Sequence, residues 1–374
     1  MNRVINMIIG IDASRAVTTQ RTGTEAYAYF LIRALIPLAA EYNLRLRLYF
    51  NQPPDGLFPQ VDHVETVILP FARLWTHVRL ARELQRRPPD LFFTPAHVVP
   101  WSYRQASCAT IHDLGYHYFP EAHTHRQSLY LRWSTRHNCR VSQFVIADSL
   151  ATKRDLVSLY ALEPERIHVV YPGIDSDLKP VTDVDLLTAV QYKFGITAPY
   201  LLYIGTLQPR KNLIHLIQAY AQSNVQHSLV IAGKKGWLSQ PILEAVWALP
   251  LSIQQRILLP GFVAEDDKGA LISGATALLY PSLYEGFGFP VLEGQACGVP
   301  VLAANSSSLP EVAGQGALLV DPLKIDQIAL GIQRLVSDEA LRTDLVQHGF
   351  ANVSRFTWAE TAVTLLKLFK SHFA

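Results

Sequence analysis

The stretch ALLYPSLYEGFGFPVLE, residues 277–293, contains the pattern on which the fold prediction rests. Its first four residues, Ala277–Tyr280, are typical of a buried strand, and a glycine-rich turn separates them from a helix opened by Pro290. Gly298 follows as the predicted C-cap of that helix. A strand, a turn and a helix form the repeating unit of a parallel α/β sheet.

Short apolar runs of this kind alternate with helical patterns along the whole chain. The first series predicts strands at Met7–Ile11, Leu44–Phe50, Val64–Leu69, Leu91–Thr94, Ala109–Ile111, Phe144–Ala147 and Ile167–Tyr171. The second series predicts strands at Tyr200–Ile204, Leu229–Ala232, Ile257–Leu259, Ala277–Tyr280, Val299–Ala303 and Ala317–Val320. Two series predict two Rossmann-like parallel-sheet domains facing a cleft, with ligands at the carboxyl ends of the strands.

The boundary between the domains is predicted where proline and aspartate cluster and periodicity fades, near residues 175–195. The N-terminal domain is therefore assigned to residues 1–180 and the C-terminal domain to residues 181–355. Asp183 and Asp185 fall in this linker and are interpreted as a solvated turn rather than a metal site. Thr357 and Glu360 have the spacing of a capping box before a final helix in residues 356–374.

Composition excludes several classes of protein. A net charge of +2 without a basic, aromatic-rich stripe argues against nucleic-acid binding. Three widely separated cysteines predict structural thiols rather than disulfides or a zinc site. Because no apolar run approaches the roughly 18 residues of a membrane span and no signal cleavage site follows the N-terminus, a cytoplasmic location is expected.

The turn after Tyr280 predicts an anion site. Backbone N–H groups near Gly288 and Phe289, together with the helix dipole, suit a pyrophosphate. Glu293 lies about one turn inside the helix, where its carboxylate can accept hydrogen bonds from two hydroxyls of a ribose, and Glu285 flanks the turn. The alternative is that the carboxylates are surface and dipole-compensating charges and the glycines only form the turn.

Three other loops follow predicted strands. Arg210 and Lys211 lie after Tyr200–Ile204 and can neutralise a diphosphate, although a solvated basic turn would look the same. His112 directly follows Ala109–Ile111 and is predicted to project into the cleft, unless it is only structural. Gly23 opens a helix but lacks the G-x-G-x-x-G pattern of a nicotinamide or flavin site.

These residues resemble those of the GT-B glycosyltransferases of family 4. Glu285 and Glu293, within Tyr-Glu-Gly-Phe-Gly-Phe-Pro and before Gly298-Val299-Pro300-Val301, resemble its E-x7-E motif. Gly205–Asn212 resembles its diphosphate-binding G-x-x-x-x-R-K-N, Ile111–Leu114 its interdomain histidine segment and Gly261–Val263 its base-recognition segment. The resemblance covers nearly the whole chain and implies a final helix that returns to the N-terminal domain.

The resemblance also implies site roles. Catalytic residues would be His112, Arg210, Lys211 and Glu285, with Glu285 on the donor-sugar hydroxyls, His112 on its outer hydroxyls and the two cations on the diphosphate. Glu293 would bind the ribose and Gly23 a phosphate, although relatives often carry two adjacent glycines where this chain has only Gly23. The further donor-binding residues would be Gly205, Thr206, Phe262, Val263, Gly286, Phe287, Gly288, Phe289 and Leu292.

The implied activity is a retaining transfer that needs no metal or other cofactor. Gly10–Ala13 and the His-Asp-Leu segment resemble mannosyltransferase-like members, so GDP-mannose is the first expected donor and a UDP-hexose the second. The acceptor would be a glycan or a lipid-linked hydroxyl. A non-catalytic sugar-nucleotide-binding subunit, an epimerase and a pyridoxal-phosphate-dependent phosphorylase are the alternatives.

Membrane association is a further interpretation. The basic helical segment 74–87, which contains Arg79, Arg82 and Trp75, could rest on an acidic membrane surface where lipid-linked acceptors reside. A solvated helix face explains the same pattern equally well.

Overall fold

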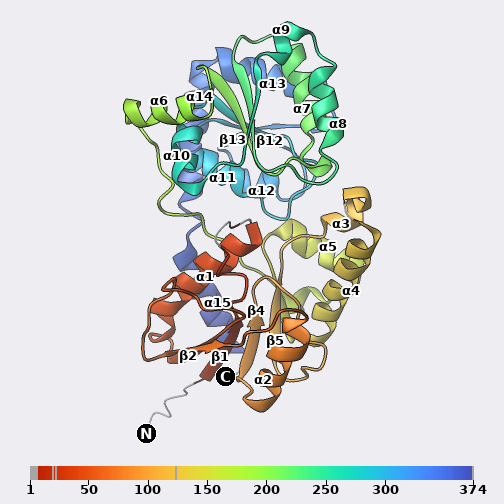
Figure 1. The fold of residues 1–374 in the computed structure, drawn as a ribbon, viewed down its shortest axis with the longest axis vertical. Coiled ribbons are helices and arrows are strands. Elements are labelled where there is room, and N and C mark those ends of the chain that lie inside the picture. The colour runs from red at the N-terminus through yellow and green to blue at the C-terminus, as the bar shows by residue number, and fades with distance from the viewer. Residues whose placement is uncertain (1–6, 19–20, 22, 123, 373–374) are drawn as a thin grey trace. The chain divides into compact units, whose positions relative to one another are not determined.

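The computed structural model describes residues 7–18, 21, 23–122 and 124–372 (Figure 1). The chain forms two compact units. The first comprises Met1–Tyr116, His125–Asp175 and Phe356–Ala374, and the second comprises Ser176–Arg355 with the short segment His117–Thr124. The sequence prediction had placed the boundary at residue 180 and kept residues 117–124 in the first domain.

The first unit contains a seven-stranded parallel sheet in the order β3-β2-β1-β4-β5-β6-β7. Its strands are β1 (Met7–Asp12), β2 (Leu44–Phe50), β3 (Val64–Ile68), β4 (Leu91–Thr94), β5 (Ser107–Ile111), β6 (Phe144–Ala147) and β7 (Ile167–Val169). Because β1 pairs with both β2 and β4, the strand order reverses between β1 and β4.

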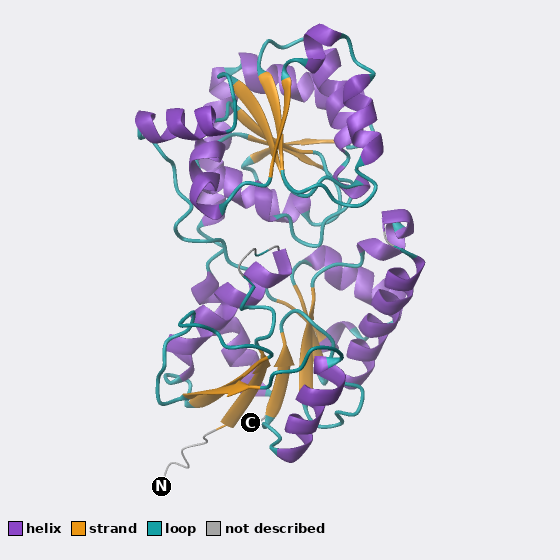
Figure 2. Cartoon of the chain, in the orientation of Figure 1, coloured by secondary structure: helices purple, strands orange, loops and turns teal. Residues whose placement is uncertain are grey.

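Helices cover both faces of this sheet (Figures 1 and 2). Phe93 packs with α1 (Gly23–Ala39) and α15 (Trp358–Ser371), whereas its neighbour Phe92 packs on the opposite face with α2 (Ala81–Arg86). Successive strand residues point to opposite faces, so a strand buried on both sides must be apolar throughout. The other helices up to residue 166 are η1 (Thr76–Leu80), α3 (Gly115–Tyr118), η2 (Pro120–Ala122), α4 (His125–Val141), α5 (Leu150–Tyr160) and η3 (Pro164–Arg166).

The final helix returns to the first unit, as predicted. The hydroxyl of Thr357 accepts a hydrogen bond from the backbone N–H of Glu360 at 3.2 Å, so the predicted cap is present. The chain is held where it leaves and re-enters this unit, because Ile174 N–H donates to the Phe356 carbonyl at 3.0 Å. Gly173 permits this approach, since a Cβ there would overlap the backbone of Trp358.

The second unit contains a six-stranded parallel sheet in the order β10-β9-β8-β11-β12-β13. Its strands are β8 (Tyr200–Ile204), β9 (Ser228–Ala232), β10 (Ile257–Gly261), β11 (Ala277–Tyr280), β12 (Val301–Ala304) and β13 (Ala317–Val320). Its helices are α6 (Val184–Lys193), η4 (Pro209–Lys211), α7 (Leu213–Ser223), α8 (Gln240–Trp247), α9 (Leu251–Gln254), α10 (Glu265–Ser273), α11 (Phe289–Ala296), α12 (Leu309–Ala313), α13 (Ile325–Ser337) and α14 (Glu339–Val353). The strand order again reverses, here between β8 and β11.

The strand predictions are confirmed, with shifted ends at several strands, but the interpretation of Asp183 and Asp185 as a solvated turn is wrong. Asp183 caps α6, because its carboxylate accepts hydrogen bonds from the N–H groups of Asp185 at 3.0 Å and Leu186 at 3.3 Å. Aspartate is common both in turns and at helix N-caps, so its presence alone did not distinguish the two.

The segment proposed for a membrane surface is helical, but its tryptophan is not exposed. Trp75 is buried and donates its indole N–H to the Leu69 carbonyl at 2.7 Å. No helix in the described ranges has both the length and the apolar character needed to cross a bilayer.

Candidate functional site

The predicted site residues of the second unit gather where its strand order reverses. β8 leads into η4, which carries Arg210 and Lys211, and the neighbouring strand β11 leads into the glycine-rich turn that carries Glu285. Ligands of parallel α/β sheets bind outside the carboxyl ends of strands at such a switch point. The topology therefore explains why residues far apart in sequence meet here.

Glu285 connects the two cations. Its Oε2 accepts a hydrogen bond from Nη1 of Arg210 at 2.8 Å, and its Oε1 accepts one from Nζ of Lys211 at 2.5 Å. The Tyr280 hydroxyl donates to the same Oε1 at 2.9 Å and accepts from Lys211 at 2.7 Å. We call Arg210, Lys211, Tyr280 and Glu285 the charged cluster.

The charged cluster keeps Glu285 ionised. Burial alone would raise the pKa of this carboxyl, but Arg210 and Lys211 outweigh that effect and lower the pKa from 4.5 to about 2. Two cations facing one carboxylate leave a single positive charge at the end of the sheet. The alternative interpretations of Glu285 as a surface charge and of the basic loop as a solvated turn are therefore wrong, because Glu285 and Lys211 are buried.

Backbone contacts hold the two loops together. Arg210 donates to the Tyr284 carbonyl at 2.7 Å, while the Leu283 N–H donates to the Arg210 carbonyl at 3.0 Å. Asn212 adopts a left-handed conformation, with φ 60°, and its amide donates to the Pro281 carbonyl at 3.1 Å. Asparagine tolerates this conformation better than most residues, which accounts for its place after the two cations.

The glycine-rich turn is fixed by two serines and by close packing. Ser307 accepts from the Glu285 N–H at 2.8 Å, and Ser308 donates to the carbonyls of Glu285 at 2.9 Å and Phe287 at 2.7 Å. Gly288 has φ 109°, and a Cβ there would lie 2.5 Å from Cδ2 of Leu309. The turn thus brings the chain to the start of α11, the predicted anion site.

Glu293 has a cationic partner that the sequence did not reveal. Nζ of Lys268 on α10 lies 3.0 Å from its Oε1 and 2.8 Å from Oε2 of Glu265. Burial lowers the pKa of Lys268, but the two carboxylates raise it above its usual value, so the lysine stays charged. Lys268 lies outside every recognised motif, and only the contact of α10 with Glu293 shows that it belongs to the site.

The remaining predicted donor residues of the second unit have mixed environments. Phe262 is exposed, with Nζ of Lys234 4.6 Å from its ring centroid, whereas Val263, Phe287 and Leu292 are buried. Buried apolar side chains can face a ligand only through their backbone. The roles predicted for these residues, and for Gly205, Thr206, Gly286 and Phe289, remain predictions.

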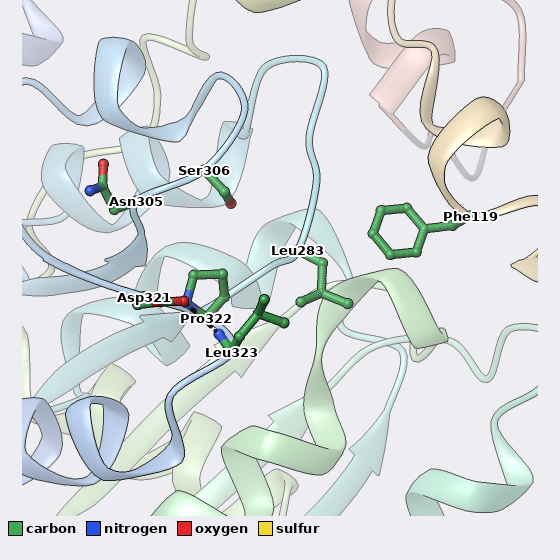
Figure 3. A pocket seen from close by; sticks show the side chains of 7 residues that line it. All are labelled: Phe119, Leu283, Asn305, Ser306, Asp321, Pro322 and Leu323. Carbon is green, nitrogen blue, oxygen red and sulfur yellow. Dashed lines mark hydrogen bonds between the residues drawn. The ribbon is translucent and has the colours of Figure 1, made fainter.

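A hollow of about 420 Å³ lies beside the charged cluster, at the carboxyl ends of β12 and β13 (Figure 3). It is lined by Phe119, Leu283, Asn305, Ser306, Asp321, Pro322 and Leu323. None of these residues is among the predicted site residues, although Leu283 belongs to the stretch 277–293, and Glu285 lies two positions beyond it, outside the lining. The volume is in the range of small-molecule pockets, and the lining offers both apolar and polar groups.

His112 and Gly23 belong to the first unit. Nδ1 of His112 lies 2.6 Å from Oδ2 of Asp148, and Nε2 lies 2.7 Å from the Pro95 carbonyl. Burial lowers the pKa of this imidazole, but Asp148 and the Pro95 carbonyl raise it overall. An oxygen of Asp148 and the Pro95 carbonyl thus face the two ring nitrogens, an arrangement that favours the protonated imidazole. The predicted contact with a sugar stays a prediction. Through a ring nitrogen, such a contact would have to replace one of these two partners.

Gly23 is the first residue of α1, and a Cβ there would meet no described atom within 4 Å. No contact within the described residues therefore requires glycine at this position. Its predicted contact with a phosphate remains a prediction.

No group of three or more potential metal-ligating side chains occurs within the described residues. All three cysteines are buried free thiols.

Comparisons with known proteins agree with this geometry. Residues 21–178 match the model of Glycosyltransferase Family 4, and residues 190–351 match that of Glycosyl transferases group 1. The O-antigen chain mannosyltransferase B of Escherichia coli is 29% identical over 386 aligned residues, which cover 96% of this chain and 99% of that protein.

Solved structures share the fold. Sucrose-phosphate synthase from Thermosynechococcus elongatus superposes with a TM-score of 0.78 at 21% identity, covering 98% of this chain and 99% of that one. Anabaena HepE in complex with UDP and glucose has a TM-score of 0.75 at 19% identity, covering 98% and 100%. The chain therefore belongs to the GT-B glycosyltransferases of family 4.

Proposed function

We propose that this protein is a retaining mannosyltransferase that transfers mannose from GDP-mannose to a hydroxyl of a glycan or lipid-linked acceptor. The observation that carries the proposal is the charged cluster, in which partly buried Arg210 and buried Lys211 hold the buried Glu285 at the switch point of a parallel sheet. The similarity to an O-antigen chain mannosyltransferase over 96% of the chain supports mannose as the transferred sugar.

The proposed reaction proceeds on one face of the sugar. The acceptor oxygen bonds to the anomeric carbon while the bond from that carbon to the diphosphate oxygen breaks on the same face. The acceptor proton passes to the departing diphosphate, so no protein nucleophile is needed. Entry and departure on one face preserve the anomeric configuration.

Arg210, Lys211 and the N-terminus of α11 are assigned to the leaving group. Negative charge grows on the diphosphate as the bond breaks, and preorganised donors aimed at that charge contribute about 3–4 kcal/mol each in a dry site. Because Glu285 already fixes both cations, little reorganisation is needed when the charge develops. This supply of positive charge supports a reaction without a metal ion.

Glu285 and Glu293 are assigned to hydroxyl recognition. An ionised carboxylate has about four lone-pair positions, so each can keep its ion pair and accept a hydroxyl of the donor. Glu293, held by Lys268, would bind the ribose, and Glu285 would bind the transferred sugar. His112 from the first unit is assigned to the outer hydroxyls.

The test is to measure thermal shift and slow donor hydrolysis with GDP-mannose, UDP-glucose, UDP-N-acetylglucosamine and dTDP-glucose. A response confined to GDP-mannose would support the proposed donor, and one to UDP-glucose would replace it with a UDP-hexose. Absence of any response would contradict the proposed function.

Two further measurements test the mechanism. The anomeric configuration of the product, read by NMR, tests retention, and unchanged turnover in EDTA tests metal independence.

A further inference from the structure

The first unit presents a group of aromatic rings from three separate segments. His77 lies on η1, Trp101 follows β4, and Tyr130, Trp133 and His137 lie on α4. We call these five residues the aromatic platform. The two indole rings lie 5.4 Å apart at 86°, and the Tyr130 and Trp133 rings lie 6.0 Å apart.

Three of the five platform residues are exposed although they are large aromatic residues. Trp101 is 50% exposed, Tyr130 47% and Trp133 40%. Tyr130, Trp133 and His137 are three and four positions apart, so they share one face of α4. Grouped exposed aromatic residues mark binding surfaces, because a single-chain protein otherwise buries such area.

Each indole is backed by an imidazole. His77 stacks on Trp101 with centroids 4.1 Å apart and 29° between planes, and His137 stacks on Trp133 at 5.3 Å and 13°. Burial lowers the pKa of both imidazoles, to about 4 for His77, so they are neutral at physiological pH. The indole faces are therefore held rigidly by uncharged rings.

Hydrogen bonds from α4 hold the loop that carries Trp101. The buried amide of Asn138 donates to the His97 carbonyl at 3.2 Å and accepts from the Val99 N–H at 3.0 Å. His137 bonds the Val99 carbonyl at 3.0 Å. A platform with fixed rings loses little conformational entropy when a ligand docks.

The same loop connects the platform to the carboxyl end of the sheet. It begins with Pro95, whose carbonyl bonds His112, and continues to His97, whose Nε2 accepts from Nε of Arg15 at 2.8 Å. Beside them, Asp12 at the end of β1 is buried, and its Oδ2 has no hydrogen-bond partner within the described part of the chain. Trp101 lies six positions after Pro95, at most about 20 Å away.

We infer that the aromatic platform binds a sugar ring of a glycan acceptor at a distance from the hydroxyl that reacts. The apolar C–H face of a hexose packs on an aromatic ring, while the polar groups near His97 suit hydroxyls. Fixed ring faces match a stiff polyhydroxylated chain, whereas a fluid membrane needs no such preorganisation. The inference rests on the proposed function, because it assumes that the acceptor is a glycan.

The test uses α-linked mannose oligosaccharides of two to five residues, titrated into the donor-free protein and followed by intrinsic fluorescence and calorimetry. Affinity is expected to rise with chain length. The variants Trp101→Ala and Trp133→Ala should weaken binding of the longest chain about tenfold, a loss of about 1.4 kcal/mol. Trp133→Phe should retain most of it, and Trp247→Ala, an exposed tryptophan on α8, serves as the matched control.

Donor hydrolysis separates this inference from the proposed function. Trp133→Ala should hydrolyse GDP-mannose like the wild type and show a raised KM only for long acceptors. Unchanged oligosaccharide binding in both alanine variants, with native melting curves, would overturn the inference while leaving the donor proposal intact. Loss of binding to phosphatidylglycerol vesicles with unchanged oligosaccharide binding would also overturn it and assign the surface to a membrane. A wild type that hydrolyses no donor contradicts the proposed function instead.

Discussion

The two units place different chemistry at the same topological position. Both sheets reverse strand order beside their first strand, between β1 and β4 in one unit and between β8 and β11 in the other. At β8 and β11 the loops bring together permanent charges, Arg210, Lys211 and Glu285. At β1 and β4 they bring together Asp12 and His97, which accepts a hydrogen bond from Arg15, and the same loop continues to the aromatic platform.

The difference teaches that topology selects the location of a site and residue chemistry selects its ligand. Parallel strands deliver their loops to one edge in both units, whatever the loops contain. Fixed, paired charges suit an anionic donor, whereas rigid aromatic faces and hydrogen-bonding groups suit an uncharged sugar chain. Variants that affect one edge should therefore leave the function of the other edge unchanged.

The largest effect is expected from Arg210→Ala. Removing a donor aimed at the leaving group should lower kcat for mannose transfer by about 100- to 1,000-fold. Binding of α-mannose oligosaccharides by the first unit should not change. Steady-state kinetics and calorimetry of the same preparation measure both quantities.

The control for that variant is Arg334→Ala, which removes an exposed arginine from α13 of the same unit. It should transfer mannose at the wild-type rate. Wild-type turnover by Arg210→Ala would show that this arginine is not needed for catalysis, whereas no turnover in the wild type itself would favour a non-catalytic subunit. Loss of oligosaccharide binding in Arg210→Ala would show that the sites of the two units are not independent.

The charged cluster should also set the acid sensitivity of the fold. The pKa of Glu285 is lower in the folded state than its ordinary 4.5, so its ion pairs stabilise the protein above that pH, and the contribution is lost as pH falls toward 2. The difference in unfolding free energy between wild type and Glu285→Gln should therefore shrink by about 3 kcal/mol between pH 5 and pH 2.

Urea unfolding at several pH values measures this difference. Glu41→Gln, which removes an exposed carboxylate from the first unit, should follow the wild-type profile. Parallel profiles for the wild type and Glu285→Gln would mean that Glu285 carries no depressed pKa.

The site at the carboxyl edge of the second unit's sheet, the second edge, was largely predictable from the sequence, and for a physical reason. A strand, a glycine turn and a helix are local patterns, so the βα units and the ends of their strands follow from neighbouring residues. Glu285 is separated from Lys211 by 74 positions, but both follow predicted strands, and parallel topology brings such loops together. The support from Tyr280 and Lys268 was not predicted, because a buried hydroxyl and a helical lysine carry no local signature.

The corresponding edge of the first unit's sheet, with the aromatic platform beyond it, was less predictable because its residues lie in ordinary local patterns. Trp101 lies in a loop and Trp133 in a basic helix. Their rings meet only in the folded unit, where Asn138 bonds the Val99 N–H and holds the loop against the helix. Trp75, the aromatic residue of the segment considered for a membrane surface, is buried. The turn interpretation of Asp183 was wrong for a related reason, since this residue caps a helix.

Lys268→Met tests whether Lys268 positions Glu293 for donor binding. Without its cation Glu293 loses a positioning contact, so the KM for GDP-mannose should rise about tenfold, equivalent to about 1.4 kcal/mol, while kcat changes little. The matched control is Lys193→Met, which breaks the 2.6 Å ion pair with Asp267 on the same helix. An equal rise in KM in both variants would attribute the effect to α10 as a whole rather than to Glu293.

The smallest effect is expected from Gly23→Ala, which tests whether the first unit contributes to the donor site. The added methyl meets no described atom within 4 Å, so the melting temperature should not fall. If a phosphate approaches the backbone here, the same methyl should obstruct it and lower kcat/KM for GDP-mannose about threefold, about 0.7 kcal/mol. Oligosaccharide affinity should stay at the wild-type value. Unchanged kinetics would confine donor binding to the second unit, and an equal loss of stability and activity would make Gly23 a structural residue.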